Sequence, residues 1–373
     1  MMHKRISAAG SLLLAVLLTL FSGCGTKPVK IGFAGCLTGR MSDLGISGRN
    51  AVQLAVEEIN QAGGIDGRPV ELIVKNNRQD EEAARKAVEA LIGEGVTAIV
   101  GHMTSSMSAA SLPIINEHET VMISPTSSSV RLSGLDDYFF RVVAPNESRT
   151  KATAEYAAET LDIRSASAII DLANSVYSRG WKDNFAKHFQ NAGGELVETI
   201  TFNSYEDPDY LGITSRALQP EPEAVVVVAN AFDTAQFCQQ FAKYSPETVV
   251  IPSGWAMTEE LIRQGGESVE GLVFAQIVDL ESQKPRFLAF KRNYQDRFGA
   301  DPDFAAVHAY TAVQILKRAV ELTPVHGSLK ETILSQKRYQ GLQSTVEFDA
   351  YGDPYRKPFI FTVEAGEFVT RTD

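Results

Sequence analysis

The hydrophobic pattern after residue 28 alternates between short apolar runs and amphipathic stretches. Val29–Gly35 is an apolar run rich in β-formers that ends in glycine, and a loop of small residues follows at 37–48. The next stretch, Asn50–Ala62, has apolar residues three and four positions apart, which is the spacing of one helix face. Gly63 and Gly64 are typical of a helix end. The chain therefore opens as strand, loop, helix.

The same alternation continues as far as Ser124. Strands that alternate with helices along a chain form parallel sheets, because each helix carries the chain back to the starting edge. The first series is therefore an α/β unit. Its remaining predicted elements are strand Val70–Val74, helix Glu81–Ile92, strand Thr97–Gly101, helix Met107–Asn116 and strand Thr120–Ser124.

A second series begins near Asn146. The continuous apolar run Val225–Val228 indicates a strand that is buried on both faces, as doubly wound sheets require. The predicted elements are helix Lys151–Leu161, strand Ser167–Asp171, helix Trp181–Asn191, strand Leu196–Phe202, helix Ile213–Leu218, strand Ala224–Val228, helix Gln236–Lys243, and strands Val249–Pro252 and Gly271–Gln276. Two such series predict two lobes, with the functional site in the cleft between them.

The hydrophobic pattern does not show to which lobe the last part of the chain belongs. Helices are predicted at Arg286–Phe298 and Asp303–Leu322, and β-like runs follow at Ser344–Phe348 and Phe359–Val363. These elements fit the sheet of either lobe. No low-complexity linker separates the two series, so we expect short hinge strands between the lobes.

The first residues belong to export rather than to the fold. Met1–Gly23 has a basic start, an apolar run and a small-residue exit, as a signal peptide does. The segment that ends at Cys24 resembles a bacterial lipobox, in which that cysteine is lipidated, although Phe21 departs from the usual leucine: Leu20-Phe21-Ser22-Gly23-Cys24. The alternative is an ordinary cleavable signal followed by a chance cysteine. Residues 24–28 then form a tether, and we expect an extracytoplasmic protein anchored in a membrane by lipid at Cys24.

Composition excludes several classes of partner and site. The 373 residues are 44% hydrophobic and carry 35 Lys and Arg against 46 Asp and Glu, a formal net charge of −11. No basic run is present, so nucleic acid is not an expected partner. Cys36 and Cys238 lie far apart in the sequence, and we expect both to be buried free thiols.

Motifs of the common enzyme classes are missing from the sequence. The glycine-rich stretch Gly32–Gly39 follows a strand but does not have the spacing G-x-G-x-x-G. The chain has no Walker A motif, no H-E-x-x-H and no G-x-S-x-G, and its six histidines are scattered. We therefore expect no catalytic residues, no metal site and no cofactor. An oxidoreductase or hydrolase on a similar scaffold is the enzyme alternative.

Hydroxyl-rich sequence follows two neighbouring strands of the first series. Thr104–Ser106 comes after one strand and opens a helix, and Ser124–Ser129 comes after the next. Exposed N–H groups at a helix start attract anions, and ligands of open α/β sheets bind beyond the carboxyl ends of the strands. The two loops together favour a site for a carboxylate. The alternative is that these residues only cap helices and form turns.

Several segments together resemble the leucine/isoleucine/valine-binding family, the type I periplasmic substrate-binding proteins of ABC importers. The resemblance covers nearly the whole mature chain. It rests on Ile31–Gly39, Asn50–Asn60, Ala62–Arg68, Ile99–His102 with Ser105-Ser106, Val121–Pro125, Tyr138–Arg141 and Ala309–Val313.

The resemblance implies two Rossmann-like lobes with parallel sheets, joined by three hinge crossings and closing around a ligand. One lobe would contain residues 29–145 and 279–342, and the other 146–278 and 343–373. It also implies that the protein is not an enzyme and has no cofactor. We expect a monomer whose partners are a small-molecule ligand, an amino acid or a related small carboxylate, and an ABC permease.

The resemblance also implies a set of ligand-binding residues. Ser105, Thr126 and Ser128 would hold the ligand carboxylate, Tyr177 would contact the ligand from the second lobe, and Asn146 falls where amino-acid binders often have an aspartate. The carboxylate that would pair with a ligand ammonium is expected near Trp255, where the sequence has no acid. Asp233 is a substitute for it that no motif places, as is Asp279.

Two departures from the family bear on ligand and structure. The disulfide of the family's first lobe has no counterpart, because Gln79 and Thr104 fall near its positions. The missing acid near Trp255 favours a carboxylate with an aromatic or neutral polar body, and the ring of Trp255 would offer that ligand a flat apolar wall. The alternative is that Trp255 packs in the core of the second lobe and that Asn146 with Asp233 completes an ordinary amino-acid site. A second function stays open: a ligand-sensing lipoprotein of the same fold that signals to a membrane partner.

Overall fold

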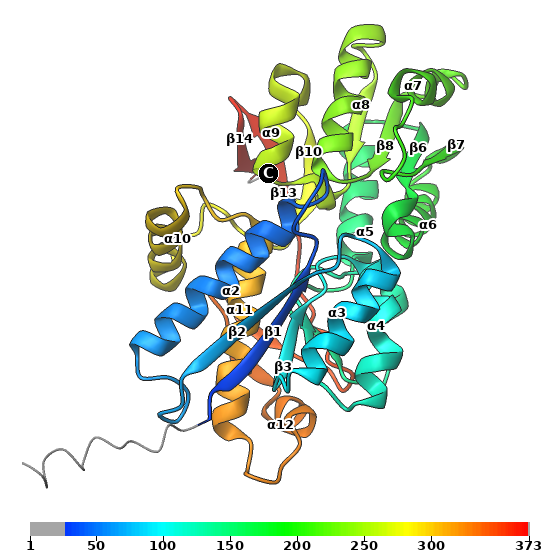
Figure 1. The fold of residues 1–373 in the computed structure, drawn as a ribbon. Coiled ribbons are helices and arrows are strands. Elements are labelled where there is room, and N and C mark those ends of the chain that lie inside the picture. The colour runs from blue at the N-terminus through cyan, green and yellow to red at the C-terminus, as the bar shows by residue number, and fades with distance from the viewer. Residues whose placement is uncertain (1–26, 372–373) are drawn as a thin grey trace, which may run out of the picture.

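The computed structural model describes residues 27–371. The predicted signal peptide Met1–Gly23 and the predicted lipidation site Cys24 lie outside the described residues. Figure 1 shows two lobes, one built around strands β1 to β5 and the other around β6 to β10. No helix within residues 27–371 has the length and apolar character needed to span a bilayer.

The first lobe is a five-stranded parallel sheet with helices on both faces. The strand order is β2-β1-β3-β4-β5. Ile31 and Phe33 of β1 face the helices α2 and α11, whereas Ala34 faces the core beneath α3 and α4. The elements are β1 Val29–Gly35, α2 Asp43–Gln61, β2 Val70–Asn76, α3 Glu81–Gly93, β3 Ala98–Gly101, α4 Ser105–Glu117, β4 Met122–Ser124 and β5 Phe139–Arg141, followed later by α10 Pro285–Phe298, α11 Phe304–Leu322 and α12 Leu329–Gln336.

The second lobe repeats this plan with four parallel strands in the order β7-β6-β8-β9. A separate antiparallel sheet, β10-β13-β14, adds a feature that the alternation pattern does not predict. The elements are α5 Glu147–Glu155, β6 Ser165–Asp171, α6 Ser175–Asn191, β7 Glu195–Phe202, α7 Tyr210–Leu218, β8 Ala224–Val228, α8 Ala231–Tyr244, β9 Val249–Pro252, α9 Glu259–Gly265, β10 Val273–Gln276, β13 Phe359–Glu364 and β14 Glu367–Thr370. The predicted fold, two α/β lobes with parallel sheets, is confirmed.

The predicted loop 37–48 is wrong in its second half, because α2 begins at Asp43. Gly45 and Gly48, two of the small residues in the predicted loop, are buried positions of this helix. A Cβ atom at Gly45 would lie 1.7 Å from the carbonyl oxygen of Cys36, so only glycine lets the first turn of α2 approach the end of β1. The local pattern did not predict β5, α9 or α12, which are short or weakly periodic.

Three passages of the chain connect the lobes. The first follows β5, the second follows β10, and Val143 and Ala144 of the first pack against Ile277 of the second. The third lies beyond Asp353. Strand β12 (Thr345–Glu347) pairs with β11 (Arg338–Gln340), and the ring of Phe348 packs edge-on against Phe140 at a centroid distance of 5.7 Å.

The expected lobe boundary at residue 342 therefore needs correction. Residues 343–353 pack on first-lobe elements through these strand and ring contacts, and the chain joins the second lobe only through β13. Sequence pattern did not resolve this because a short β-like run fits either lobe until its pairing partner is known.

Candidate functional site in the cleft between the lobes

The two hydroxyl-rich loops of the first lobe lie side by side at the carboxyl ends of β3 and β4. Ser105 is the first residue of α4, and its Oγ accepts a hydrogen bond of 3.2 Å from the backbone N–H of Ser129. The hydroxyl of Thr126 donates to the carbonyl of Met103. Ser128 is buried, and its carbonyl accepts a hydrogen bond of 2.8 Å from the N–H of Asn146. The structure thus brings Ser105, Thr126 and Ser128 to one edge of the sheet.

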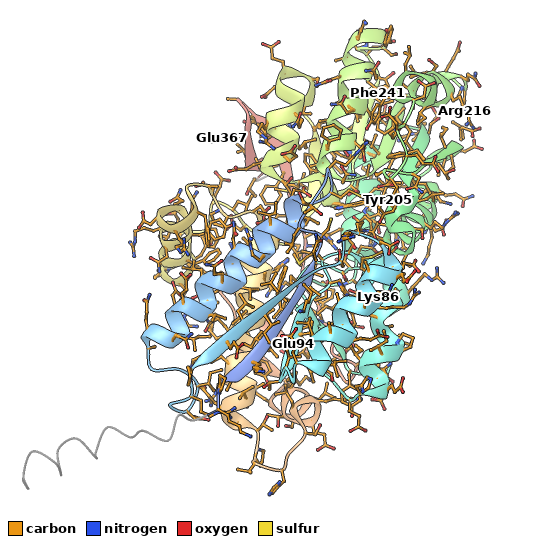
Figure 2. All side chains as sticks on the ribbon, in the orientation of Figure 1. Lys86, Glu94, Tyr205, Arg216, Phe241 and Glu367 are labelled. Carbon is orange, nitrogen blue, oxygen red and sulfur yellow. The ribbon has the colours of Figure 1, made fainter. Side chains whose placement is uncertain are left out.

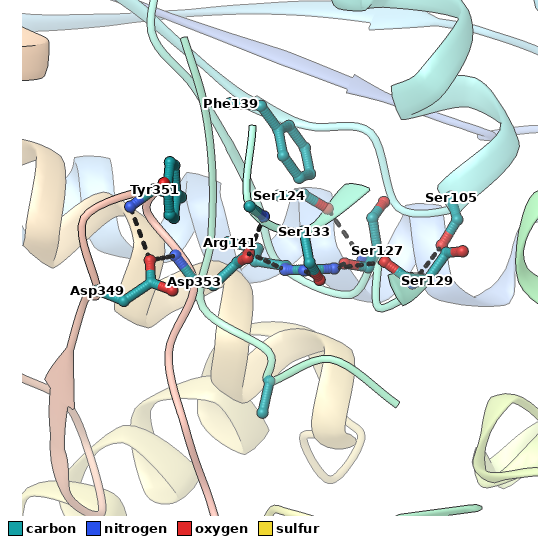
Figure 3. A network of polar contacts seen from close by, with 12 residues as sticks. Ser105, Ser124, Ser127, Ser129, Ser133, Phe139, Arg141, Asp349, Tyr351 and Asp353 are labelled. Atoms are coloured by element: carbon teal, nitrogen blue, oxygen red, sulfur yellow. Dashed lines mark hydrogen bonds and ion pairs between the residues drawn. The ribbon is translucent and has the colours of Figure 1, made fainter. Parts of the chain in front are cut away.

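Arg141 donates hydrogen bonds to the Ser124–Ser129 loop and so fixes its position, as Figure 3 shows. Its guanidinium donates to the Ser129 carbonyl at 2.8 Å and to the hydroxyl of Ser133, and its Nε lies 2.6 Å from Oδ1 of Asp353. Burial lowers the pKa of Arg141, and the charge of Asp353 opposes this shift. The sequence segment Tyr138–Arg141 resembles the family, but no local pattern predicts this role of Arg141, because Asp353 is 212 residues away in the chain.

Two aromatic rings of the second lobe pack against each other. Tyr177 and Trp255 are both buried, and their rings meet edge-on with centroids 5.8 Å apart. Burial raises the pKa of Tyr177, which remains a neutral hydrogen-bonding phenol at physiological pH. The Nε2 of Gln276 donates to the carbonyl of Gly254, directly before Trp255, at 3.2 Å.

The lobes touch through hydrogen bonds that run from loop to loop. The N–H of Ser106 donates to Oδ1 of Asn174 at 3.1 Å, and its hydroxyl accepts from the N–H of Val176 at 3.1 Å. The hydroxyl of Ser129 donates to the carbonyl of Val176 at 2.7 Å. In Figure 2, the labelled Tyr205 lies at this boundary between the lobes. These contacts place the first-lobe loops directly against the residues next to Tyr177.

Asp233 does not have the role expected for it. Its Oδ1 accepts hydrogen bonds from Tyr210 and from Arg40, the latter at 3.5 Å, and its Oδ2 accepts from Ser204 and Asn230. A carboxylate with donors on both oxygens has little capacity left for a ligand ammonium. Asp233 instead joins the lobes through Arg40, so we withdraw it from the ligand-binding set.

Asn146 lies at the start of α5 in the first hinge passage. It is fully buried, and its Oδ1 accepts a hydrogen bond of 3.4 Å from Nδ2 of Asn184. Its own Nδ2 has no partner among the described residues. This amide is therefore a buried donor in the first passage between the lobes.

Arg149, one turn further along α5, was missed by sequence analysis. Its side chain is buried in the second lobe, where Nη1 donates to Oε1 of Gln276 at 2.9 Å. Burial is the first cause of its lowered pKa. The only sequence signal is an arginine close to Asn146 in an otherwise helical pattern, which reads equally well as a surface residue.

The side chains at the family's disulfide positions meet in a different way. The hydroxyl of Thr104 donates to Oε1 of Gln79 at 3.0 Å, and both residues are buried. Cys36 and Cys238 are free and buried, as expected. Burial raises the pKa of Cys36 to about 11 and that of Cys238 to about 12, so neither thiol forms a reactive thiolate at neutral pH.

Comparisons with known proteins identify the family of the chain. A family model described as periplasmic binding protein matches residues 28–367. The chain belongs to this family. Periplasmic binding proteins of this kind are extracytoplasmic solute-binding components of ABC transport, and the predicted family is therefore confirmed.

Individual relatives of this periplasmic binding protein are distant but match over nearly their whole length. The "Leu/Ile/Val-binding protein homolog 3" of Brucella melitensis is 22% identical, with 94% of this chain and 95% of the relative covered. A leucine-binding protein from Thermotoga maritima superposes with a TM-score of 0.85 at 25% identity, covering 92% and 98% of the two chains. A solute-binding protein from Rhodopseudomonas palustris, solved with 3,4-dihydroxybenzoic acid, gives a TM-score of 0.81 at 21% identity, covering 92% and 96%.

Proposed function

We propose that this periplasmic binding protein captures a small carboxylate between its lobes and delivers it to an ABC permease. The observation that carries the proposal is the pair of joined hydroxyl loops, at Ser105 and Ser128, set against the Tyr177–Trp255 rings of the other lobe. Hydroxyl and backbone N–H donors at a helix start suit a carboxylate, and aromatic walls suit its apolar body. Of the related solved structures, one is a leucine-binding protein and another holds 3,4-dihydroxybenzoic acid, and both of these ligands carry a carboxylate.

We further propose that the preferred ligand has no ammonium group. An ammonium enclosed without a carboxylate partner loses its hydration at a cost of several kcal/mol. Position 254–255 has no acid, and Asp233 already binds Arg40 and Tyr210. A carboxylate with an aromatic or neutral polar body avoids this cost.

Calorimetry with leucine and with 4-methylpentanoate, which lacks only the amine, tests the ligand class. We expect 4-methylpentanoate to bind at least as tightly as leucine. A loss of affinity of about a hundredfold on removal of the amine, equivalent to roughly 2.7 kcal/mol, would instead demonstrate a paired ammonium and contradict the proposal.

The carboxylate site is tested by the variants Ser105→Ala and Ser128→Ala. Each loss of a charge-assisted hydrogen bond weakens binding by about 1.5–3 kcal/mol. The probe is the acid that most raises the melting temperature of the wild-type protein in a screen of aliphatic, aromatic and amino acids. Ser335→Ala, an exposed hydroxyl on α12, is the matched control and leaves affinity unchanged. If both site variants bind with wild-type affinity, the hydroxyl residues of these loops only cap helices and form turns.

Delivery to a permease is tested in cells. Deletion of the gene should abolish uptake of that same acid, supplied with a radioactive label, and the wild-type gene should restore it. Normal uptake together with a lost transcriptional response would favour the sensing role over the importer role.

A further inference from the structure

Arg149 is a buried cation without a carboxylate partner in the described chain. It lies on α5, directly after the first passage between the lobes, and the residue is only 5% exposed. Nη1 donates to Gln276 at 2.9 Å and Nη2 to the carbonyl of Ala144 at 3.5 Å, both neutral acceptors. Its Nε has no partner among residues 27–371. The guanidinium of Arg149 is therefore buried with its Nε–H donor unpaired and with no anionic group to balance its charge.

Two more basic residues in this region, His308 and Arg356, have buried nitrogen atoms without a partner among residues 27–371. Both ring nitrogens of His308, on α11 of the first lobe, are buried without a described partner, and so is Nε of Arg356 in the third passage. The hydroxyl of Ser148 reaches the carbonyl of Arg356 at 3.5 Å, which places this passage beside the first turn of α5. Burial, with the charges of Arg356 and Arg149, holds the pKa of His308 well below its usual range.

The contrast with Arg141 shows what is missing. Arg141 is as deeply buried, but it has Asp353 at 2.6 Å and accepting carbonyls around its other nitrogens. A buried cation that lacks such a partner lowers the free energy of unfolding, because its lost hydration is not replaced. Groups that carry this cost are candidates for binding a ligand.

Arg149 also lies near Tyr177 and the segment that contains Trp255, the two residues proposed to contact the ligand from the second lobe. Its charge is close enough to Tyr177 to oppose the rise in the pKa of that phenol, and Gln276, which it binds, also donates to the carbonyl of Gly254 beside Trp255. An anion at Arg149 would therefore lie next to the two rings.

From these contacts we infer that the ligand carries a second anionic group, which Arg149 binds with support from His308 and Arg356. This inference rests on the proposed function, because the first carboxylate is assigned to the Ser105 and Ser128 loops. The ligand class is then a small dicarboxylate, aliphatic or aromatic, rather than a monoacid.

The test compares monoacids with diacids of the same skeleton on the wild-type protein and on Arg149→Met. The probes are benzoate against terephthalate and pentanoate against glutarate, measured by calorimetry. The wild-type protein should bind the better diacid at least tenfold more tightly than its monoacid. Arg149→Met should lose this preference and keep its monoacid affinity. Arg263→Gln, an exposed arginine on α9, is the control and should behave as the wild type.

The melting temperature without ligand separates a binding role from a structural one. Since Arg149 lacks a partner in the described structure, Arg149→Met should melt at the wild-type temperature or above it. A lower melting temperature in Arg149→Met, with no diacid preference in the wild-type protein, would overturn the inference.

Three further outcomes would also decide against it. If monoacids bind through Ser105 but diacids gain nothing, the proposed function stands and this inference fails. If sodium chloride or sodium sulfate stabilises the wild-type protein but not Arg149→Met, while diacids show no preference, the site holds a free anion instead of the ligand. If none of the acids binds the wild-type protein, the proposed function itself fails.

Discussion

Two buried arginines in neighbouring parts of the chain have opposite surroundings. Arg141 is enclosed by an aspartate, a hydroxyl and backbone carbonyls, so its charge is compensated and its side chain fixes the loop of Thr126 and Ser128. Arg149 has only two neutral acceptors. Identity alone does not separate these roles, because the energy of a buried charge depends on the groups that surround it.

At this scale we predict that Arg141→Met destabilises the protein. Removing one partner leaves the carboxylate of Asp353 and the carbonyls of the loop without their donors, which costs about 3–5 kcal/mol. Urea denaturation measures the loss. Arg338→Met, which removes an exposed pair with Glu347, should change stability by less than about 1 kcal/mol. Equal stabilities of the two variants would contradict the assigned role of Arg141.

Among the elements, the loop after β1 and the start of α8 form a contact between the two lobes. Arg40 of the first lobe reaches Asp233 and Tyr210 of the second, and its guanidinium also lies over the ring of Phe232 at 5.6 Å. Asp43 at the start of α2 accepts a further cross-lobe hydrogen bond of 2.9 Å from Thr258. Such contacts favour closure by the difference between their energies in the closed and open states.

We therefore predict that Arg40→Met weakens ligand binding without reducing the stability of either lobe. The Arg40 side chain is 30% exposed, so solvent screens its pair with Asp233, and the expected loss is about two- to fivefold in affinity. Calorimetry measures it with the best acid of the screen. Lys86→Met, which breaks an exposed pair within α3, is the control and should bind as the wild type does. Unchanged affinity in Arg40→Met would show that this pair does not contribute to closure.

For the whole molecule, the proposed delivery of a ligand requires that the protein stay near a permease in the membrane. The proposed lipid at Cys24 would provide this, because it tethers the acidic chain to a membrane through the short segment 24–28. A lipid chain supplies the anchor that a spanning helix otherwise would.

Cys24→Ser tests the anchor. The variant should accumulate unprocessed or leave the membrane, whereas the wild-type protein should enter the detergent phase of a detergent partition. Cys36→Ser, which changes a buried thiol of the first lobe, should partition as the wild type does. If Cys24→Ser stays in the detergent phase, the lipoprotein proposal is wrong and an ordinary signal peptide is the better interpretation.

The sequence by itself determined the alternation of strands and helices, the two-lobe plan and the two hydroxyl loops. These follow from local periodicity and from the residues that end each strand, and both are encoded within about ten to twenty neighbouring positions. The strands Val29–Gly35, Ala224–Val228 and Val249–Pro252 have the predicted bounds.

Only the tertiary structure decided which charges are paired and which lobe takes residues 343–353. Arg141 meets Asp353 across 212 positions, Arg40 meets Asp233 across 193, and Arg149 meets Gln276 across 127. The sequence allowed Asp233 to bind an ammonium, and it contained no signal for Arg149. Whether a buried charge is satisfied depends on donors and acceptors that distant segments bring within about 3 Å, and no local pattern contains that information.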